Sequence, residues 1–308
     1  MVLPAVPHGG QRSKLRNSTA DRTFHAVNFL LMLFIFLVYA WPMWFVIVAS
    51  FSDPNLVTSG QVWLWPKGIH FGGYQLVFQN KDILTGYANS LFYTVVGTVI
   101  NMVLTICAAY PLSRMDFIPR KFLTIMFIIT MYFSGGLIPT FLQVRDLGLT
   151  NTPWAMIIPG AISIFNVLLL RSFFMYGIPQ SLEEAAILDG ANTLQMLVRI
   201  VLPLVKPTLA VLVLYYAVGH WNDYFSALLY IGDRDLLPLQ SILREILIVG
   251  KIDMTTTGME MEAIVQKLKI AQTVKYSAII VSTLPLMLVY PFVQKYFVKG
   301  IMMGAVKG

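Results

Sequence analysis

The sequence predicts an all-α integral membrane protein with about six transmembrane helices. Of its 308 residues, 57% are hydrophobic and only 12% are charged, whereas soluble domains carry about 25% charged residues, and the mean hydropathy is +0.70. Several apolar runs approach the roughly 20 residues that a helix needs to cross a bilayer. These runs are too long and continuous for the strands of a membrane barrel, so helices are the structure that satisfies their backbone in lipid.

Six apolar runs follow one another along the chain. We expect transmembrane spans at residues 24–50, 86–111, 120–143, 154–175, 202–230 and 274–296. Trp41-Pro42 predicts a kink in the first span, and Gly135-Gly136 with Pro139 interrupts the third; neighbouring helices can satisfy the backbone groups that such breaks release. In domain terms, residues 1–23 are expected to form a cytoplasmic N-terminal segment, residues 24–300 the transmembrane domain, and residues 301–308 a cytoplasmic C-terminal tail.

The net charge of +7 does not indicate a nucleic-acid partner, because the basic residues gather at the ends of the apolar runs and not on one amphipathic face. The short segments rich in Lys and Arg all fall on one side of the predicted spans. By the positive-inside rule that side is cytoplasmic, so we expect both termini and residues 179–203 in the cytoplasm. Cys107, the single cysteine, lies within an apolar run, where we expect it to be a packing residue.

Residues 179–203 form a polar, acid-containing segment between two apolar runs. Ser181 and Glu184 have the spacing of a capping box, in which a hydroxyl and a carboxylate satisfy free amides of the first helical turn. Gly190 permits a turn that costs other residues more, and a second short helix is expected over residues 192–199. The segment therefore predicts a helix-turn-helix lying on the membrane surface.

Within this segment, Glu184-Ala185-Ala186, Gly190 and Ile200-Val201-Leu202-Pro203 fill every fixed position of the pattern E-A-A-x3-G-x9-I-x-L-P. The segment resembles the EAA signature of the membrane subunits of binding-protein-dependent ABC importers. The resemblance implies a type I importer permease fold, with this segment as a cytoplasmic coupling helix that docks on an ATPase subunit. The docking residues that it implies are Glu183, Glu184, Ala185, Ala186, Asp189, Gly190 and Ala191. In the alternative interpretation, Glu184 only caps its own helix and Gly190 only ends it.

Other segments are similar to the carbohydrate class of these permeases, of the maltose type and its complex-oligosaccharide branch. They are Asn89-Ser90-Leu91, Ala108 to Arg114, Trp221-Asn222-Asp223-Tyr224 and the tail from Tyr296 to Gly308. The resemblance implies that the tail contacts the ATPase dimer interface, and a frayed polar end is the alternative; the residues concerned are Gly304, Ala305, Val306, Lys307 and Gly308. Residues 231–273 are longer than in the maltose relatives and amphipathic near residues 261–270. They form either a docking surface for a solute-binding protein or a mobile loop.

Polar side chains recur on one face of the second span, at intervals of three or four residues. They are Ser90, Thr94, Thr98, Asn101 and Thr105. Neutral hydroxyl and amide groups suit a sugar path, but they serve helix packing equally. In the fifth span, Tyr216, His220 and Asp223 share a face; an intramembrane acid is a functional candidate, although an interfacial aromatic belt fits as well. His220 and Asp223 lack a third ligand, so no metal site is expected.

The sequence carries no G-x4-G-K-[ST] loop, so we expect this chain not to bind or hydrolyse ATP through a P-loop. It also lacks H-E-x-x-H, G-x-S-x-G and paired-cysteine motifs, which argues against an intramembrane enzyme, and we expect a transport subunit with no cofactor of its own. The resemblance implies a bacterial inner-membrane subunit that translocates oligosaccharides. Its implied partners are a second homologous permease, two ATPase subunits that bind ATP and Mg²⁺, and an extracytoplasmic solute-binding protein. An ion-coupled secondary carrier is the alternative, but it would require paired intramembrane acids and internal repeats, of which the spans show little. A membrane scaffold or sensor without transport is a third interpretation.

Overall fold

The computed structural model describes residues 19–252, 272–291 and 294 of the chain. Every regular element in these residues is a helix, so the predicted all-α fold is confirmed. Within the described residues, three helices are long and apolar enough to cross a membrane, namely α1 (Thr19–Ser50), α4 (Lys81–Ser113) and the helix Gln272–Pro291. Two further pairs of helices meet the same criterion when each bent pair is taken together.

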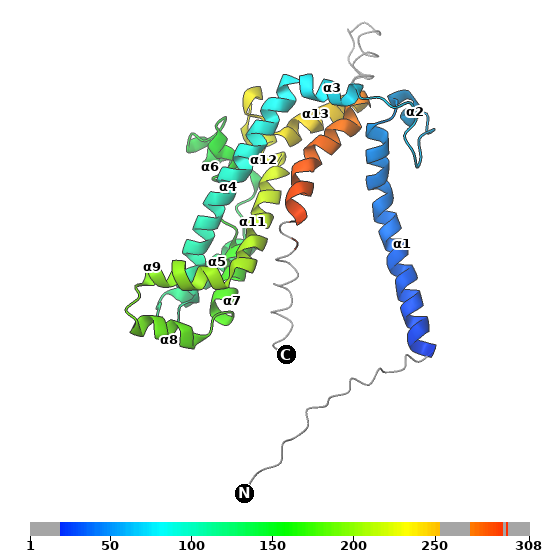
Figure 1. Ribbon diagram of the computed structural model, residues 1–308. Helices are drawn as coiled ribbons and strands as arrows, with labels where there is room; N and C mark the ends of the chain where they lie inside the picture. Colours follow the sequence, from blue (N-terminus) through cyan, green and yellow to red (C-terminus); the bar gives the residue numbers. More distant parts are fainter. Residues whose placement is uncertain (1–18, 253–271, 292–293, 295–308) are drawn as a thin grey trace.

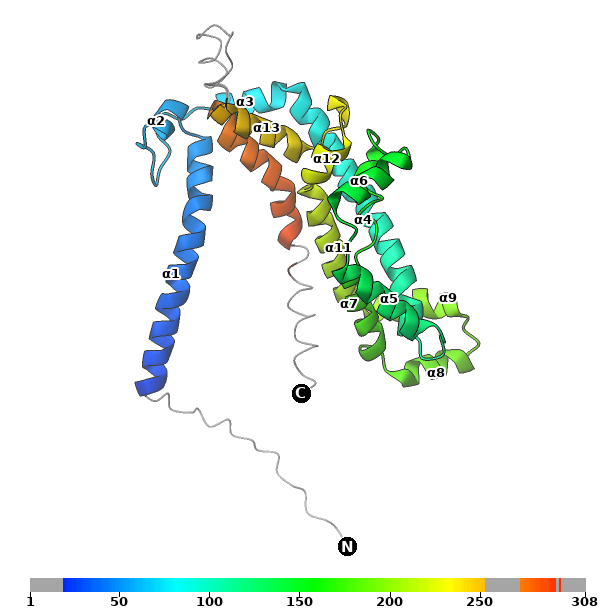
Figure 2. The same ribbon diagram turned by 180° about the vertical axis from the view of Figure 1, so that it is seen from behind.

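The first helix, α1, stands away from the other helices over most of its length (Figures 1 and 2). Its side chains are exposed from Asp21 to Tyr39, and burial begins only near its end, at Val48. The helix continues without a break through Pro42. Because most of the side chains exposed after Phe24 are apolar, α1 offers most of its surface to lipid or to another membrane helix.

Two short helices, α2 (Pro54–Thr58) and α3 (Gly72–Gln79), connect α1 to α4. The start of α4 is fixed by Asn80, whose Oδ1 accepts a hydrogen bond of 3.2 Å from the backbone N–H of Ile83. Such a side-chain cap satisfies one of the free amides of the first helical turn. The second span therefore begins at Lys81, earlier than the predicted residue 86.

The third predicted span is a bent pair of helices. α5 (Arg120–Tyr132) and α6 (Leu137–Asp146) meet at 112°. Between them, Gly136 has a φ of +89°, a conformation that glycine adopts at little cost. The expected interruption at Gly135-Gly136 is present, but it reverses the course of the chain instead of kinking one straight span.

The fourth predicted span, residues 154–175, is wrong as one continuous helix. A single 3-10 turn, η1 (Pro153–Met156), precedes a helix of only 13 residues, α7 (Ile164–Tyr176). Pro159-Gly160 lies between them, where proline lacks the N–H that a helix interior needs. Ser163 then caps α7, accepting a hydrogen bond of 3.4 Å from the N–H of Asn166.

The fifth predicted span, residues 202–230, is likewise divided. It holds α10 (Leu202–Leu204), α11 (Lys206–Trp221) and α12 (Phe225–Tyr230). The chain bends by 84° between the helical stretch that ends at Leu204 and α11. After α12, a 3-10 turn η3 (Arg234–Leu236) leads into α13 (Leu239–Ile252).

Helix α4 is the centre of the bundle, and α7, α11 and α13 all pack against it. At the end of the molecule that carries the segment after α7, buried Ala109, Leu170 and Leu212 join α4, α7 and α11 in one core. At the opposite end, Trp221 and Leu239 belong to a second core that includes residues of the helix Gln272–Pro291. α1 starts at the end of the molecule where the segment after α7 lies (Figure 1).

Candidate functional site

The polar segment after α7 folds as a helix-turn-helix, as expected. α8 (Gln180–Leu188) is followed by α9 (Thr193–Gln195) and a π-helical turn, η2 (Met196–Val201), that runs into α10. The predicted capping box at Ser181 and Glu184 is wrong, because α8 begins one residue before Ser181 and no side chain caps it. Pro179 precedes the first helical residue, where a backbone N–H has no partner within the helix. Its fixed φ also suits the entry to a helix. Glu184 Oε1 instead accepts a hydrogen bond of 2.8 Å from Gln180 Nε2.

The capping box of this segment lies at the second helix. Gln195 N donates to Asn192 Oδ1 at 2.8 Å, and Asn192 N donates to Gln195 Oε1 at 3.0 Å. Between the two helices, Gly190 has a φ of +77°, and Ala191 N reaches back to Ala186 O at 2.9 Å. This is the hydrogen-bond pattern that commonly ends a helix at a left-handed glycine. The turn geometry is thus set by Gly190 and Asn192.

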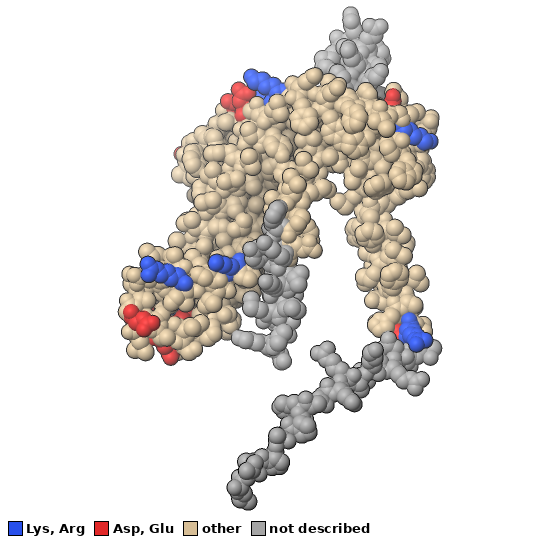
Figure 3. All heavy atoms as spheres, in the orientation of Figure 1, with Lys and Arg blue, Asp and Glu red and all other residues tan. Residues whose placement is uncertain are grey.

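The outer surface of this helix-turn-helix is apolar and acidic. Ile187, Leu188 and Leu194 are 65%, 88% and 69% exposed. Glu184 and Asp189 are exposed beside them, and Figure 3 shows acidic groups at this end of the molecule. Large apolar side chains exposed next to charged ones are typical of a protein-binding surface.

The residues implied for ATPase docking divide between this surface and the interior. Glu184, Ala185, Asp189 and Gly190 are exposed, whereas Ala186 is buried in the core of the bundle and Ala191 is half-buried. The small side chain of Ala186 therefore brings α8 close to its own bundle.

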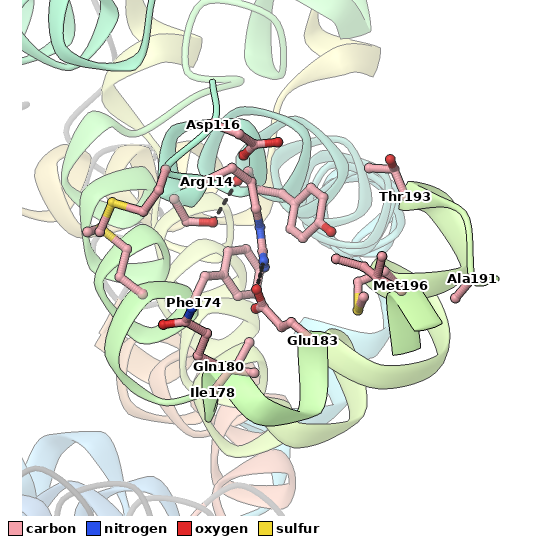
Figure 4. A pocket seen from close by; sticks show the side chains of 14 residues that line it. Arg114, Asp116, Phe174, Ile178, Gln180, Glu183, Ala191, Thr193 and Met196 are labelled. Carbon is pink, nitrogen blue, oxygen red and sulfur yellow. Dashed lines mark hydrogen bonds and ion pairs between the residues drawn. The ribbon is translucent and has the colours of Figure 1, made fainter. Parts of the chain in front are cut away.

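Glu183 points inward and forms an ion pair with Arg114 at the end of α4 (Figure 4). The Arg114 guanidinium also lies over the Tyr110 ring, 4.4 Å from its centroid. The pair borders a cavity of about 530 Å³ between the end of α4, α7, α8 and the start of α9. Sequence reasoning did not single out Arg114 as a site residue. The available signal was a basic residue and an acidic residue at the same predicted membrane face.

The polar face of α4 makes contacts between helices. Ser90 Oγ accepts a hydrogen bond of 2.9 Å from the N–H of Leu239 in α13. Thr105 Oγ1 and the Tyr216 hydroxyl share a hydrogen bond of 2.7 Å. Thr94 and Thr98, on the same face, have hydroxyl oxygens that are buried without a hydrogen-bond partner in the described structure. This face therefore lies against protein, and the candidate path residues of α4 and α11 are brought together.

Asn101 is fully buried, as are Ser90 and Thr105 on the same face. Its Nδ2 donates to Gly160 O at 2.8 Å, and its Oδ1 lies 2.7 Å from His220 Nε2. A buried amide that serves two helices fixes their relative position, because leaving either partner unpaired is costly. Asn101 thus ties α4 both to α11 and to the break before α7.

Tyr216, His220 and Asp223 line a second cavity, of about 200 Å³, between α11 and the η1 region; Tyr215 and Ser226 are also at its wall. Asp223 Oδ1 accepts a hydrogen bond of 3.0 Å from Ser226 N, at the start of α12. Hydroxyl, imidazole and carboxylate groups beside a tyrosine ring form a surface suited to a sugar. In the part of the chain that the structure describes, no group of three or more His, Cys, Asp and Glu residues is placed to hold a metal ion.

At the far end of α4, Arg234 of η3 forms ion pairs with Asp82 and with Glu245 of α13, at 2.8 and 3.3 Å. The hydrogen bond to Asp82 and the charge of Glu245 raise the pKa of the Arg234 side chain above its ordinary value. The amphipathic stretch expected at residues 261–270 and the tail residues 304–308 lie outside the described residues.

Comparison with known proteins gave a family and close relatives. Residues 83–303 match the family described as binding-protein-dependent transport system inner membrane component. The chain is 38% identical over 294 residues to Protein LplC of Bacillus subtilis, with 96% of this chain and 98% of that one covered. It is 41% identical over 291 residues to the polygalacturonan/rhamnogalacturonan transport system permease protein YtcP of the same organism, covering 94% and 99%.

A solved structure is similar over nearly the whole chain. It belongs to a bacterial ABC transporter involved in the import of the acidic polysaccharide alginate, with 36% identity and a TM-score of 0.82, covering 91% of this chain and 98% of that one. A second chain, from an alginate transporter in complex with a periplasmic protein that holds an alginate pentasaccharide, shares the fold with a TM-score of 0.61 at 18% identity, covering 89% and 93%.

Proposed function

Since this chain belongs to the family of binding-protein-dependent transport system inner membrane components and has the fold of a type I ABC importer permease, we propose that it translocates oligosaccharides across a bacterial inner membrane. An extracytoplasmic solute-binding protein delivers the sugar, and separate ATPase subunits drive the transport. ATP and Mg²⁺ bind to those subunits, and this chain catalyses no reaction.

The helix-turn-helix of α8 and α9 is the observation that supports coupling to an ATPase. It presents Ile187, Leu188 and Leu194 to solvent, with Glu184 and Asp189 beside them. A soluble partner with an apolar groove rimmed by basic or amide groups fits this surface, because burying exposed leucine and isoleucine side chains supplies the affinity. Such a partner would lie on the cytoplasmic side, where ATP is available, and the distribution of Lys and Arg favours the same side for both termini.

Pairing with a second permease is supported by α1. The helix is mostly apolar and exposed from Phe24 to Tyr39 and stands apart from its own bundle (Figure 2). A homologous subunit packed between α1 and the bundle would cover this face. At the opposite end of the molecule, the solute-binding protein would dock on the region of α3 and α13.

The sugar would pass along the contact between α4 and α11, where Tyr216, His220 and Asp223 line the cavity of about 200 Å³. Aromatic rings suit the apolar faces of sugars, and the polar groups suit their hydroxyls. ATP binding would close the ATPase pair and open this path outward, and hydrolysis would reset it. Such alternation requires nucleotide and binding protein to favour different conformations.

Substitution of Leu188 by arginine tests this proposal. Removing a leucine from a buried interface costs about 1.5–3 kcal/mol, and a buried unpaired charge costs more, so the affinity for the ATPase subunits should fall at least about tenfold. Leu147→Arg is the matched control, because Leu147 is 64% exposed at the end of α6, far from α8 in both views. The measurements are co-purification of the ATPase subunits and sugar-stimulated ATP hydrolysis by the complete complex in liposomes.

The proposal predicts that Leu188→Arg loses both signals and Leu147→Arg keeps both. Sugar uptake by this chain in liposomes that lack any ATPase, driven by an ion gradient, would show a secondary carrier and refute the proposal. Equal ATPase binding by the two variants would refute the assignment of α8 as the docking surface.

A further inference from the structure

Two adjacent glutamates of α8 point in different directions, one toward the bundle and one away from it. Glu183 turns inward to Arg114, and its side chain is 22% exposed. Glu184 is exposed and accepts a hydrogen bond from Gln180 of its own helix. Neighbouring positions on a helix are about 100° apart around its axis, so one residue can face the bundle while the next faces a partner. Glu183 therefore contacts the bundle, whereas Glu184 is available to a partner.

In the described structure Arg114 forms its ion pair with Glu183, whereas Asp116 borders the same cavity without pairing with Arg114. The Arg114 side chain is 19% exposed, and its Nε and Nη2 atoms are buried without a hydrogen-bond partner in the described structure. The Tyr110 ring below the guanidinium contributes an attraction, but a neutral ring does not replace an anion. A largely buried cation that loses its acid is strongly destabilised. Separating Glu183 from Arg114 would thus leave a largely buried cation unpaired, and this electrostatic penalty keeps the two side chains together.

The ion pair joins two elements that the proposed function requires to move together. Glu183 belongs to α8, the docking element, and Arg114 terminates α4. Nearer its middle, the same helix α4 carries Asn101 and Thr105, which form hydrogen bonds with His220 and Tyr216 at the sugar cavity. A contiguous set of contacts therefore runs from the ATPase surface to that cavity.

We propose that the Arg114–Glu183 ion pair is the link that transmits movement of α8 to α4. This inference rests on the proposed function and names positioning residues for it. The cavity of about 530 Å³ beside the pair is the reason why a link is needed. Without the pair, α8 has room to move toward α4 without displacing it.

The test compares single substitutions with a charge exchange in the complete complex in liposomes. Glu183→Gln and Arg114→Gln each break the ion pair, and Glu183→Arg with Arg114→Glu restores it in reverse. The readout is the number of ATP molecules hydrolysed per sugar transported, which a purely structural role would leave unchanged in the complexes that assemble. Each single variant should raise this ratio several-fold, because ATP hydrolysis then continues in cycles in which α8 moves without α4. The exchanged pair should return it toward the wild-type value.

Two matched controls are available in the chain. Glu184→Gln should weaken ATPase binding while the ratio in assembled complexes stays as in the wild type. Asp146→Asn removes an exposed ion pair with Arg145 at the far end and should change neither quantity. Should a single variant fail to assemble, the exchanged pair decides the matter, because it keeps a cation and an anion at the two positions.

The outcomes separate this inference from the proposed function. A wild-type complex in which sugar does not stimulate ATP hydrolysis would refute the function. A wild-type complex that works, with single variants at the wild-type ratio or an assembled exchanged pair as uncoupled as the single variants, would overturn the link alone.

Discussion

A methyl group added at Gly97 should disturb the contact between α4 and α11. A Cβ atom at this position would lie 2.4 Å from His220 Nε2 and 2.6 Å from its Cε1, well inside van der Waals contact. The His220 ring has little freedom to yield, because Nε2 is held 2.7 Å from Asn101 Oδ1. Gly97→Ala therefore displaces the ring and breaks that hydrogen bond.

The magnitude follows from three contributions to the free energy of unfolding. Forcing an extra methyl group into a packed site costs about 1–3 kcal/mol. Loss of an interhelical hydrogen bond in a membrane protein costs about 0.6 kcal/mol on average. Alanine regains about 1 kcal/mol over glycine as a helix former. The variant should be less stable than the wild type by between about 0.6 and 2.6 kcal/mol.

The assay is the unfolding of the purified full chain in detergent micelles by increasing denaturant, with Gly219→Ala as the matched control. Gly219 lies in α11 next to His220, and a Cβ there would meet no atom within 4 Å. That variant should match the wild type or gain up to about 1 kcal/mol from helix propensity. If Gly97→Ala proves as stable as Gly219→Ala, the close approach of α4 and α11 described above is incorrect.

Two further predictions concern single residues at the two ends of the bundle. Gly190→Ala places a side chain at a φ of +77° in open space, so it should cost about 1–2 kcal/mol from backbone strain alone, and Gly190→Asn should cost less in the same unfolding assay. Arg234→Gln removes ion pairs with Asp82 and Glu245 that are largely exposed, so its cost should stay within about 1 kcal/mol and should shrink as salt is added; a larger, salt-independent loss would show that η3 depends on Arg234 for its fold.

Local chemistry made the fold of the coupling segment predictable. Gly190 and Asn192 act on backbone atoms one to four residues away, so the turn and the second helix could be expected from the sequence alone. The prediction of a capping box at Ser181 and Glu184 was wrong for a reason that is also local. Ser181 and Glu184 have the right spacing, but Pro179 already starts the helix at Gln180, which leaves Ser181 inside the first turn.

Sequence patterns could not predict the directions of the helices or the contacts between residues that are far apart in the chain. Apolar runs measure hydropathy and not direction, so the interruption at Gly135-Gly136 could be predicted but not its 112° bend, and the short α7 looked like part of a longer span. The Arg114–Glu183 ion pair joins residues far apart in the chain, and many other pairs of opposite charge would have fitted the sequence equally. The polar face of α4 was found by its helical spacing, whereas the partners of its side chains depend on how α11 and α13 pack.

The position of α4 explains why these features belong together. The helix has 33 residues and is therefore about 50 Å long, enough to cross a bilayer and reach both of its surfaces. Ser90 bonds to α13 near one end, Asn101 and Thr105 bond to partners around the cavity, and Arg114 pairs with α8 at the other end. A helix transmits a displacement along its axis because its backbone hydrogen bonds resist stretching, and one rigid element in contact with three sites makes their positions dependent on one another. A shift of α8 that is carried by Arg114 must therefore alter either the contacts of Asn101 and Thr105 or the position of α11 with them.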